Sequence, residues 1–199
     1  MKTLEEFVDW LPELEEHEAY FLILFARKKY GAERDAALGR EVVSDKDTFI
    51  DKCSILLNNM SVKGAYLNHC GLYFTPNPRD LKKAQFKTAK EILKLIEQGS
   101  DRSPVHVAKD AVQTSKSKSR FVHFEIDEKP LPDHIAHTVK SMHGKVVETR
   151  GGYHLLFPVE DFDNAKGGYL YKDEAVDRRG DLLMPVVGTL QGGHGVEMK

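Results

Sequence analysis

The order of apolar and polar positions divides the chain into helical and extended segments. In residues 79–98 the apolar side chains recur at helical spacing and Gly99 follows, which predicts an amphipathic helix whose lysine-rich face is either solvated or a nucleic-acid contact. Residues 12–30 begin acidic and end basic around an apolar run, so we predict a packing helix there as well. Residues 49–60 are predicted as a third helix, capped by Asp45 or Asp47, and residues 65–75 as a strand before a tight loop.

The second half of the chain has the pattern of a mixed sheet. Residues 99–119 are polar and predict a connection or a loosely packed helix. Beyond them we expect a strand at 120–127, a helix at 130–144, strands at 145–150 and 153–158, and an extended segment at 184–190. The expected fold is α+β: a mainly helical N-terminal part (1–100), a polar connection (101–119), and a core (120–199) whose mixed or antiparallel sheet is flanked by helices.

Composition and charge narrow the classes of protein. No apolar run approaches the roughly 18 residues that cross a bilayer, and the acidic N-terminus does not have the character of a signal or transit peptide, so we expect a cytoplasmic protein without a membrane span. Cys53 and Cys70 are too few for a disulfide framework. A net charge of −2 excludes a protein that coats nucleic acid by overall charge, so any such contact must come from local patches.

The segment RFVHFEIDEK carries the first candidate chemistry. In a strand over 121–127, Phe121, His123, Glu125 and Asp127 lie on one face and the intervening apolar residues on the other. Carboxylates at i and i+2 on a rigid strand can share hard cations such as Mg²⁺ or Mn²⁺, which prefer oxygen ligands. The alternative is a pair of acids on a solvated sheet face.

The segment VVETRGGYHLLFP carries the second. Gly151 and Gly152 permit a sharp turn with exposed backbone N–H groups, a concavity that suits phosphate oxygens. Arg150 adds a bidentate phosphate donor, and His154 begins the returning strand. His154 is interpreted either as a structural histidine or as a residue that contacts phosphate or acts as an acid or base.

The third segment, AVDRRGDLLMPVVGTLQGGHG, offers a further carboxylate from Asp177 or Asp181, together with arginines that include Arg179. A turn with internal ion pairs would have the same sequence. Thr189 and Gln191 belong to a polar, glycine-rich tail that either lines a substrate pocket or forms a loop.

Together these segments resemble the archaeo-eukaryotic primase superfamily, including the primase-polymerases of plasmids and phages. FEID, TRGGYH and VD stand in the order of that family's two acids separated by one residue, small-residue turn with histidine, and hydrophobic residue followed by aspartate. PVVGTLQGG is similar to the Pro-Gly-Thr segment that follows, with Val187 where Pro is common. Glu125 stands where Asp is commoner, and the resemblance covers about 80 residues, from 120 to the end.

The resemblance implies a metal-dependent nucleotidyltransferase of the primase-polymerase type, which adds nucleotides from nucleoside triphosphates to a primer or starts one on a single-stranded DNA template. It implies Mg²⁺ or Mn²⁺ as cofactor and a separate helicase as a possible partner. The implied metal ligands are Glu125, Asp127 and Asp177 or Asp181, with His154 completing the catalytic set. The implied nucleotide-binding residues are Thr149, Arg150, Gly151, Gly152, His154, Arg179, Thr189, Gln191 and, from YFTPNPR, Arg79.

Two other functions fit the same residues. A non-catalytic relative would bind single-stranded nucleic acid or a replication partner, and a metal-dependent nuclease or phosphoesterase would use acids and a histidine to hydrolyse phosphodiesters.

Overall fold

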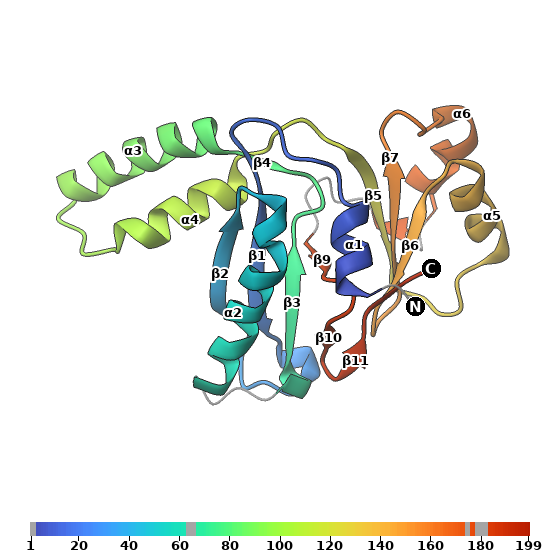
Figure 1. Ribbon diagram of the computed structural model, residues 1–199, viewed down its shortest axis with the longest axis horizontal. Helices are drawn as coiled ribbons and strands as arrows, with labels where there is room; N and C mark the ends of the chain where they lie inside the picture. Colours follow the sequence, from blue (N-terminus) through green and yellow to red (C-terminus); the bar gives the residue numbers. More distant parts are fainter. Residues whose placement is uncertain (1–2, 63–66, 174–175, 178–182) are drawn as a thin grey trace.

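Two antiparallel sheets lie side by side, and the helices pack around them (Figure 1). The structure, a computed structural model, describes residues 3–62, 67–173, 176–177 and 183–199. The helices are α1 (Leu4–Trp10), α2 (Phe49–Val62), α3 (Leu81–Glu97), α4 (Pro104–Thr114), α5 (Asp133–Ser141) and α6 (Asn164–Gly167), with short 3₁₀ turns between some of them. The expected α+β class is therefore confirmed.

The first sheet has the order β11-β10-β3-β1-β2, with β4 beside β1 and β9 beside β3. Its strands are β1 (Glu18–Ala26), β2 (Ala36–Val43), β3 (Cys70–Phe74), β4 (Arg79–Asp80), β9 (Met184–Pro185), β10 (Leu190–Gln191) and β11 (His194–Gly195). The last three come from the end of the chain. The predicted core segment after residue 120 therefore also contributes strands to the sheet built by the N-terminal half.

The second sheet has the order β12-β6-β7-β5-β8. Its strands are β5 (Phe121–Ile126), β6 (Lys145–Glu148), β7 (Tyr153–Pro158), β8 (Val176–Asp177) and β12 (Glu197–Met198), and each neighbouring pair is antiparallel. Strands β5, β6 and β7 and helix α5 fall where the hydrophobic pattern predicts them. An antiparallel sheet flanked by helices is thus confirmed for this part of the chain.

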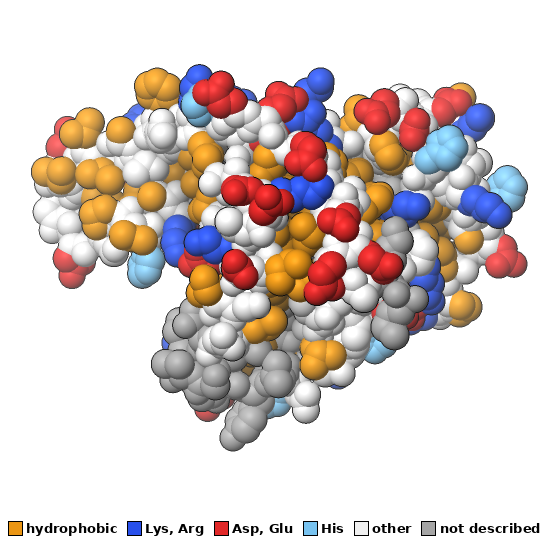
Figure 2. All heavy atoms as spheres, viewed as in Figure 1, with side chains coloured by type: hydrophobic (Ala, Val, Ile, Leu, Met, Phe, Trp, Pro, Cys, Tyr) orange, Lys and Arg blue, Asp and Glu red, His pale blue; other side chains and the backbone are white. Residues whose placement is uncertain are grey.

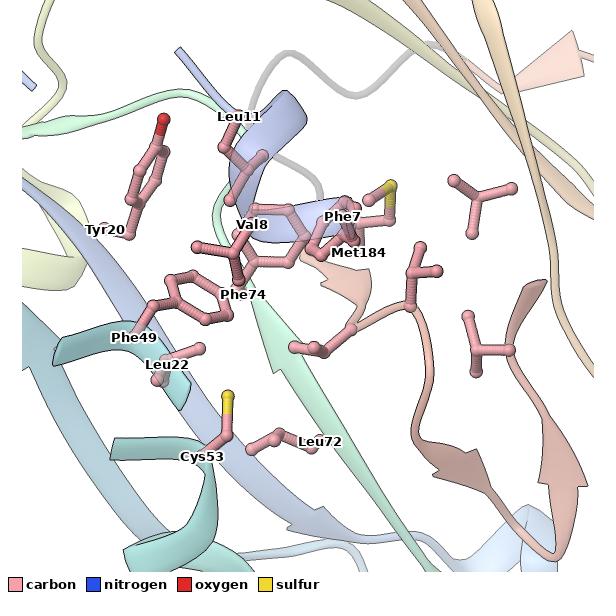
Figure 3. Packing of buried hydrophobic residues seen from close by; sticks show 14 of the residues in the cluster. Phe7, Val8, Leu11, Tyr20, Leu22, Phe49, Cys53, Leu72, Phe74 and Met184 are labelled. Atoms are coloured by element: carbon pink, nitrogen blue, oxygen red, sulfur yellow. The ribbon is translucent and has the colours of Figure 1, made fainter. Parts of the chain in front are cut away.

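The main hydrophobic core joins the two sheets through α1. Phe7 of α1 packs edge to face against Phe74 of β3 (Figure 3). The same cluster includes Leu156 of β7 and Met198 of β12. A second cluster fills the outer face of the second sheet, beneath α5. The two cores together hold β5 and β7 between apolar layers, which fixes the direction of their side chains.

The predicted helix at 12–30 is wrong, because residues 18–26 form β1, the strand between β2 and β3. Its side chains from Glu18 to Leu24 are all buried. A strand covered on both faces is apolar at consecutive positions, so it lacks alternation and resembles a buried helix in sequence. The helix at 49–60 is confirmed as α2 and that at 79–98 as α3, whose side-chain cap is Asp80.

Residues 99–119 are predicted as a connection or a loosely packed helix, and residues Pro104–Thr114 of this segment form helix α4. In the part of the chain that the structure describes, none of the helices combines the length and apolar character needed to cross a membrane.

Candidate functional site

The three sequence motifs meet in one row across the second sheet. Glu125 of β5 lies directly opposite His154 of β7 on one side and opposite Asp177 of β8 on the other. Directly opposed residues in an antiparallel pair have Cβ atoms about 4.5–5.5 Å apart. The backbone register therefore brings residues separated by up to 52 positions in the sequence into contact range.

The alternation predicted for β5 is confirmed. Phe124 and Ile126 point into the outer core beneath α5, whereas Phe121 points into the core between the sheets. His123 and Glu125 share the inner face with Phe121, since successive strand residues alternate. The Nε2 atom of His154 lies 3.9 Å from Oε1 of Glu125, so the two side chains do meet on that face.

A second histidine, His123, contacts the Nδ1 side of the His154 ring. Nε2 of His123 lies 2.8 Å from Nδ1 of His154, and both rings are buried. Burial lowers the pKa of His154 to about 3, with a smaller contribution from the positive charge of Lys29. Burial also lowers the pKa of His123 well below its usual value, with a smaller contribution from the charge of the neighbouring His154. The pair is therefore neutral at neutral pH, and one ring must donate its N–H to the other.

The turn between β6 and β7 is closed by its own hydrogen bonds. Thr149 N–H donates to the Gly152 carbonyl (2.9 Å), and Gly152 N–H donates to Oγ1 of Thr149 (3.2 Å). A side chain at Gly152 would collide with the Ile126 carbonyl 1.8 Å away, so this glycine is needed for close approach to β5. The expectation of an open row of N–H groups is thus wrong at Gly152, while Gly151 is exposed.

Arg150 links this turn to the first sheet. Its backbone N–H donates to Oε1 of Gln191 (2.9 Å), and its guanidinium donates to the Gly192 carbonyl (2.7 Å). The guanidinium also lies 5.0 Å from the ring centroid of Tyr30, a cation–π distance. Gln191 in turn donates to the hydroxyl of Tyr73 (3.3 Å). Arg150 and Gln191, both predicted site residues, are therefore brought together.

A surface cavity of about 430 Å³ opens beside Arg150. It is lined by Tyr30, Asn68, His69, Arg150, Gly192, Gly193 and His194. Lys29, whose charge reaches His154, lies over the Tyr30 ring at 5.4 Å. A lining of arginine and histidines with an adjacent lysine suits an anionic ligand such as a polyphosphate.

Arg79 lies apart from this cluster, and the hydroxyl of Thr189 is engaged within its own turn. Arg79 pairs with Ala19 near the start of β1, whereas Gln191 pairs with Gly71, which faces Phe25 near the end of β1. Six residues along a strand correspond to ~20 Å. Thr189 is buried and donates its hydroxyl to the Val186 carbonyl (2.7 Å), so that group closes its own turn.

Asp127 follows β5 directly and is exposed, and its Cα lies against Gly152 of the neighbouring turn. Only the backbone of Asp177 is described. The side chain of Asp177, together with Arg179 and Asp181, lies outside the described residues.

Several residues of this region are not among the predicted site residues. His123 could have been found, because alternation places it on the face of Glu125. Lys29, Tyr30 and Tyr73 come from the N-terminal half, and only the pairing of distant strands brings them to Arg150 and Gln191.

Among the described side chains, no group of three histidine, cysteine or acidic residues is close enough to hold a metal ion. Carboxylate oxygens are donors that Mg²⁺ and Mn²⁺ prefer, and Glu125, Asp127 and Asp177 would supply them. Glu125 presents a partly buried carboxylate beside a neutral imidazole. The backbone of Asp177 lies opposite Glu125, and Asp127 follows the end of β5.

Comparisons with protein-family models, with curated proteins and with solved structures give no match.

Proposed function

We propose that this protein is a metal-dependent nucleotidyltransferase of the primase-polymerase type, which uses nucleoside triphosphates and a single-stranded DNA template. The observation that supports the proposal is the row His154–Glu125–Asp177, in which three motifs of the resembled family lie on neighbouring strands in register. The order of the motifs along the sequence does not by itself require this register.

In this proposal Glu125, Asp127 and Asp177 would hold two divalent cations, Mg²⁺ or Mn²⁺. When bound, such ions lower the pKa of an attacking 3′-hydroxyl and stabilise the charge of the leaving pyrophosphate. The protein's own contribution is to fix the acids on rigid strands, with the His154 end of the row buried beside Val147 of the apolar core.

His154 would orient the triphosphate. Its ring is neutral, and if Nδ1 accepts the hydrogen bond from His123, then Nε2 carries the hydrogen and can donate to a phosphate oxygen. Arg150 and Lys29 would supply positive charge to the same polyphosphate at the edge of the cavity. His123 is then a positioning residue that sets the tautomer of His154.

The test is a primer-extension assay on a primed DNA template with deoxynucleotides or ribonucleotides and Mn²⁺ or Mg²⁺. The protein should extend the primer, and Asp127→Ala should abolish extension while its circular dichroism spectrum stays unchanged. Glu128→Ala is the matched control, because Glu128 is the exposed neighbour of Asp127 and lies outside the motif.

Other outcomes separate the alternatives. Metal-dependent shortening of a labelled single strand without nucleotides would favour a nuclease. Strand binding without extension, cutting or nucleotide uptake would favour a non-catalytic binding domain. Full activity of Asp127→Ala would remove that residue from the mechanism.

A further inference from the structure

Helix α3 belongs to an arm that leaves the body of the protein. It begins beside β4, packs mainly against α4, and extends away from both sheets (Figure 1). Of its 17 residues, only Ala84 is buried. Most of the helix surface is therefore open to a partner.

One side of this helix is an exposed apolar stripe. Phe86, Ala89, Leu93 and Ile96 follow one another at intervals of three, four and three residues, which places them in one line along the helix. Phe86 is 80% exposed, Leu93 63% and Ile96 69%. Figure 2 shows hydrophobic side chains gathered over the arm. Contiguous exposed apolar surface of this kind is a mark of an interaction site.

A line of lysines runs beside the apolar stripe. Lys83, Lys87, Lys90 and Lys94 are spaced by four, three and four residues, and all are exposed. The ammonium group of Lys83 pairs with Asp80 and that of Lys87 donates to Thr114, so the charges of Lys90 and Lys94 carry most of the argument. Lys90 is four residues after Phe86 and three before Leu93, so it adjoins the stripe directly. The only carboxylates of α3 are Glu91 and Glu97. Since the whole chain carries a net charge of −2, this positive line is a local concentration.

We propose that the stripe and the lysine line form a docking surface for an amphipathic helix of another protein, one with an apolar face and an acidic flank. Apolar residues at intervals of three and four accept the matching positions of a second helix, and the lysines select the acidic flank by charge. This surface is independent of the proposed catalytic row.

A second copy of the chain fits this surface less well. In an antiparallel self-pair that sets Phe86 against Ile96 of the other copy, Lys83 would meet Glu97 of that copy. Lys90, however, would face Lys90 of that copy. Lys87 and Lys94 would gain no carboxylate. An acidic helix would satisfy the whole line, so charge favours a different partner over self-association.

Single-stranded nucleic acid also fits less well. Bases stack on aromatic rings, and Phe86 is the one aromatic residue in the stripe, whereas Leu93 and Ile96 are aliphatic.

The test uses the full chain and two synthetic, fluorescein-labelled helical peptides of 21 residues. Both carry leucine at intervals of three and four; the acidic peptide carries glutamate on the flank, and the control carries lysine at the same positions. Fluorescence anisotropy should show saturable binding of the acidic peptide, weakened by salt, and little binding of the basic one.

Two exposed-surface variants locate the contact, with thermal melts to verify folding. The Phe86→Ser/Leu93→Ser variant should weaken binding of the acidic peptide by at least ~10-fold, because two large apolar side chains can no longer be buried against the peptide. The Lys87→Glu/Lys90→Glu/Lys94→Glu variant should lose the acidic peptide and gain the basic one. Primer extension, if present, should be unchanged in both variants.

The proposal is overturned if neither peptide binds, if both bind equally, or if the charge-reversed variant does not exchange its preference. It is overturned too if sedimentation velocity shows a dimer that the Phe86→Ser/Leu93→Ser variant dissolves, since the stripe would then be a self-interface. Binding of single-stranded DNA that needs the three lysines, without peptide binding, would assign the surface to nucleic acid instead.

Discussion

The two faces of the second sheet carry different kinds of side chain, although the same strands form both faces. On the outer face, β5 and β7 present only apolar side chains, such as Phe124 and Leu155, to the core beneath α5. On the inner face, the same strands bury His123 and His154 and hold Glu125 partly buried beside them. Burying polar groups costs free energy unless they are paired, and here the two histidines pair with each other while the Glu125 carboxylate stays partly exposed. The outer face contributes stability, and the inner face carries the side chains of the proposed site.

The largest expected contrast comes from Glu125→Gln, which keeps the shape and removes the charge. If Glu125 holds a cation, primer extension should fall by on the order of 10³-fold while the free energy of unfolding changes little, since hydrogen-bonding capacity is retained. Steady-state extension kinetics and urea unfolding measure the two effects. Glu128→Gln is the control and should keep wild-type activity.

The outer face should respond in the opposite way. Leu155 adjoins His154 in sequence but is fully buried in the outer core. Leu155→Ala should lower the free energy of unfolding by ~2–5 kcal/mol through lost transfer energy and a cavity. Activity per folded molecule should be retained at temperatures well below the melting point, and a specific loss of turnover would erase the distinction between the faces.

His154→Ala should act on nucleotide binding. Removing the proposed phosphate donor should raise KM for the nucleoside triphosphate by roughly 10–10²-fold, with a smaller change in kcat, because the cations and their ligands remain. Extension rates measured across a nucleotide titration separate the two constants. An unchanged KM would show that His154 does not touch the nucleotide.

The buried histidines should also make stability depend on pH. The pKa of His154 is lowered to about 3 in the folded protein, so between pH 6.5 and 3 the unfolded chain binds a proton that the folded one excludes. Stability therefore rises with pH across this window. From pH 7 to pH 5, the metal-free wild type should lose ~2 kcal/mol more than His154→Phe in urea unfolding. Equal losses would mean that His154 protonates without unfolding.

The smallest effect is expected at His123, which acts only through His154. His123→Phe should raise KM for the nucleotide by ~10-fold, because the tautomer and orientation of His154 are no longer fixed. His123→Gln, whose amide N–H can still donate to Nδ1 of His154, should restore most of the affinity. If Phe and Gln behave alike, the hydrogen bond between the rings is not what matters.

The sequence predicts the second sheet well because its signals are local. Alternation in 121–127, the glycine turn before His154 and the spacing of α5 each depend on neighbouring residues, and each is found in the structure. The central strand β1 was missed because burial on both faces removes alternation. Tyr30 and Tyr73 were missed for a related reason: their place beside Gln191 depends on pairing between strands far apart in sequence.

The same difference between local and long-range signals separates the site residues that are brought together from those that are not. Strands β5 and β7 are each recognisable from a clear local pattern, and Glu125 and His154 meet because these strands pair with the two residues opposite each other. Arg79 was placed near the substrate from a short loop motif, which does not specify the end of the sheet at which the loop lies.

The most direct test is a crystal structure with Mn²⁺ and a non-hydrolysable nucleoside triphosphate. Anomalous scattering should locate manganese about 2.0–2.3 Å from carboxylate oxygens of Glu125 and Asp127, with the triphosphate beside His154 and Arg150. Manganese and nucleotide bound elsewhere, with Glu125 and Asp127 touching neither, would contradict the proposed function.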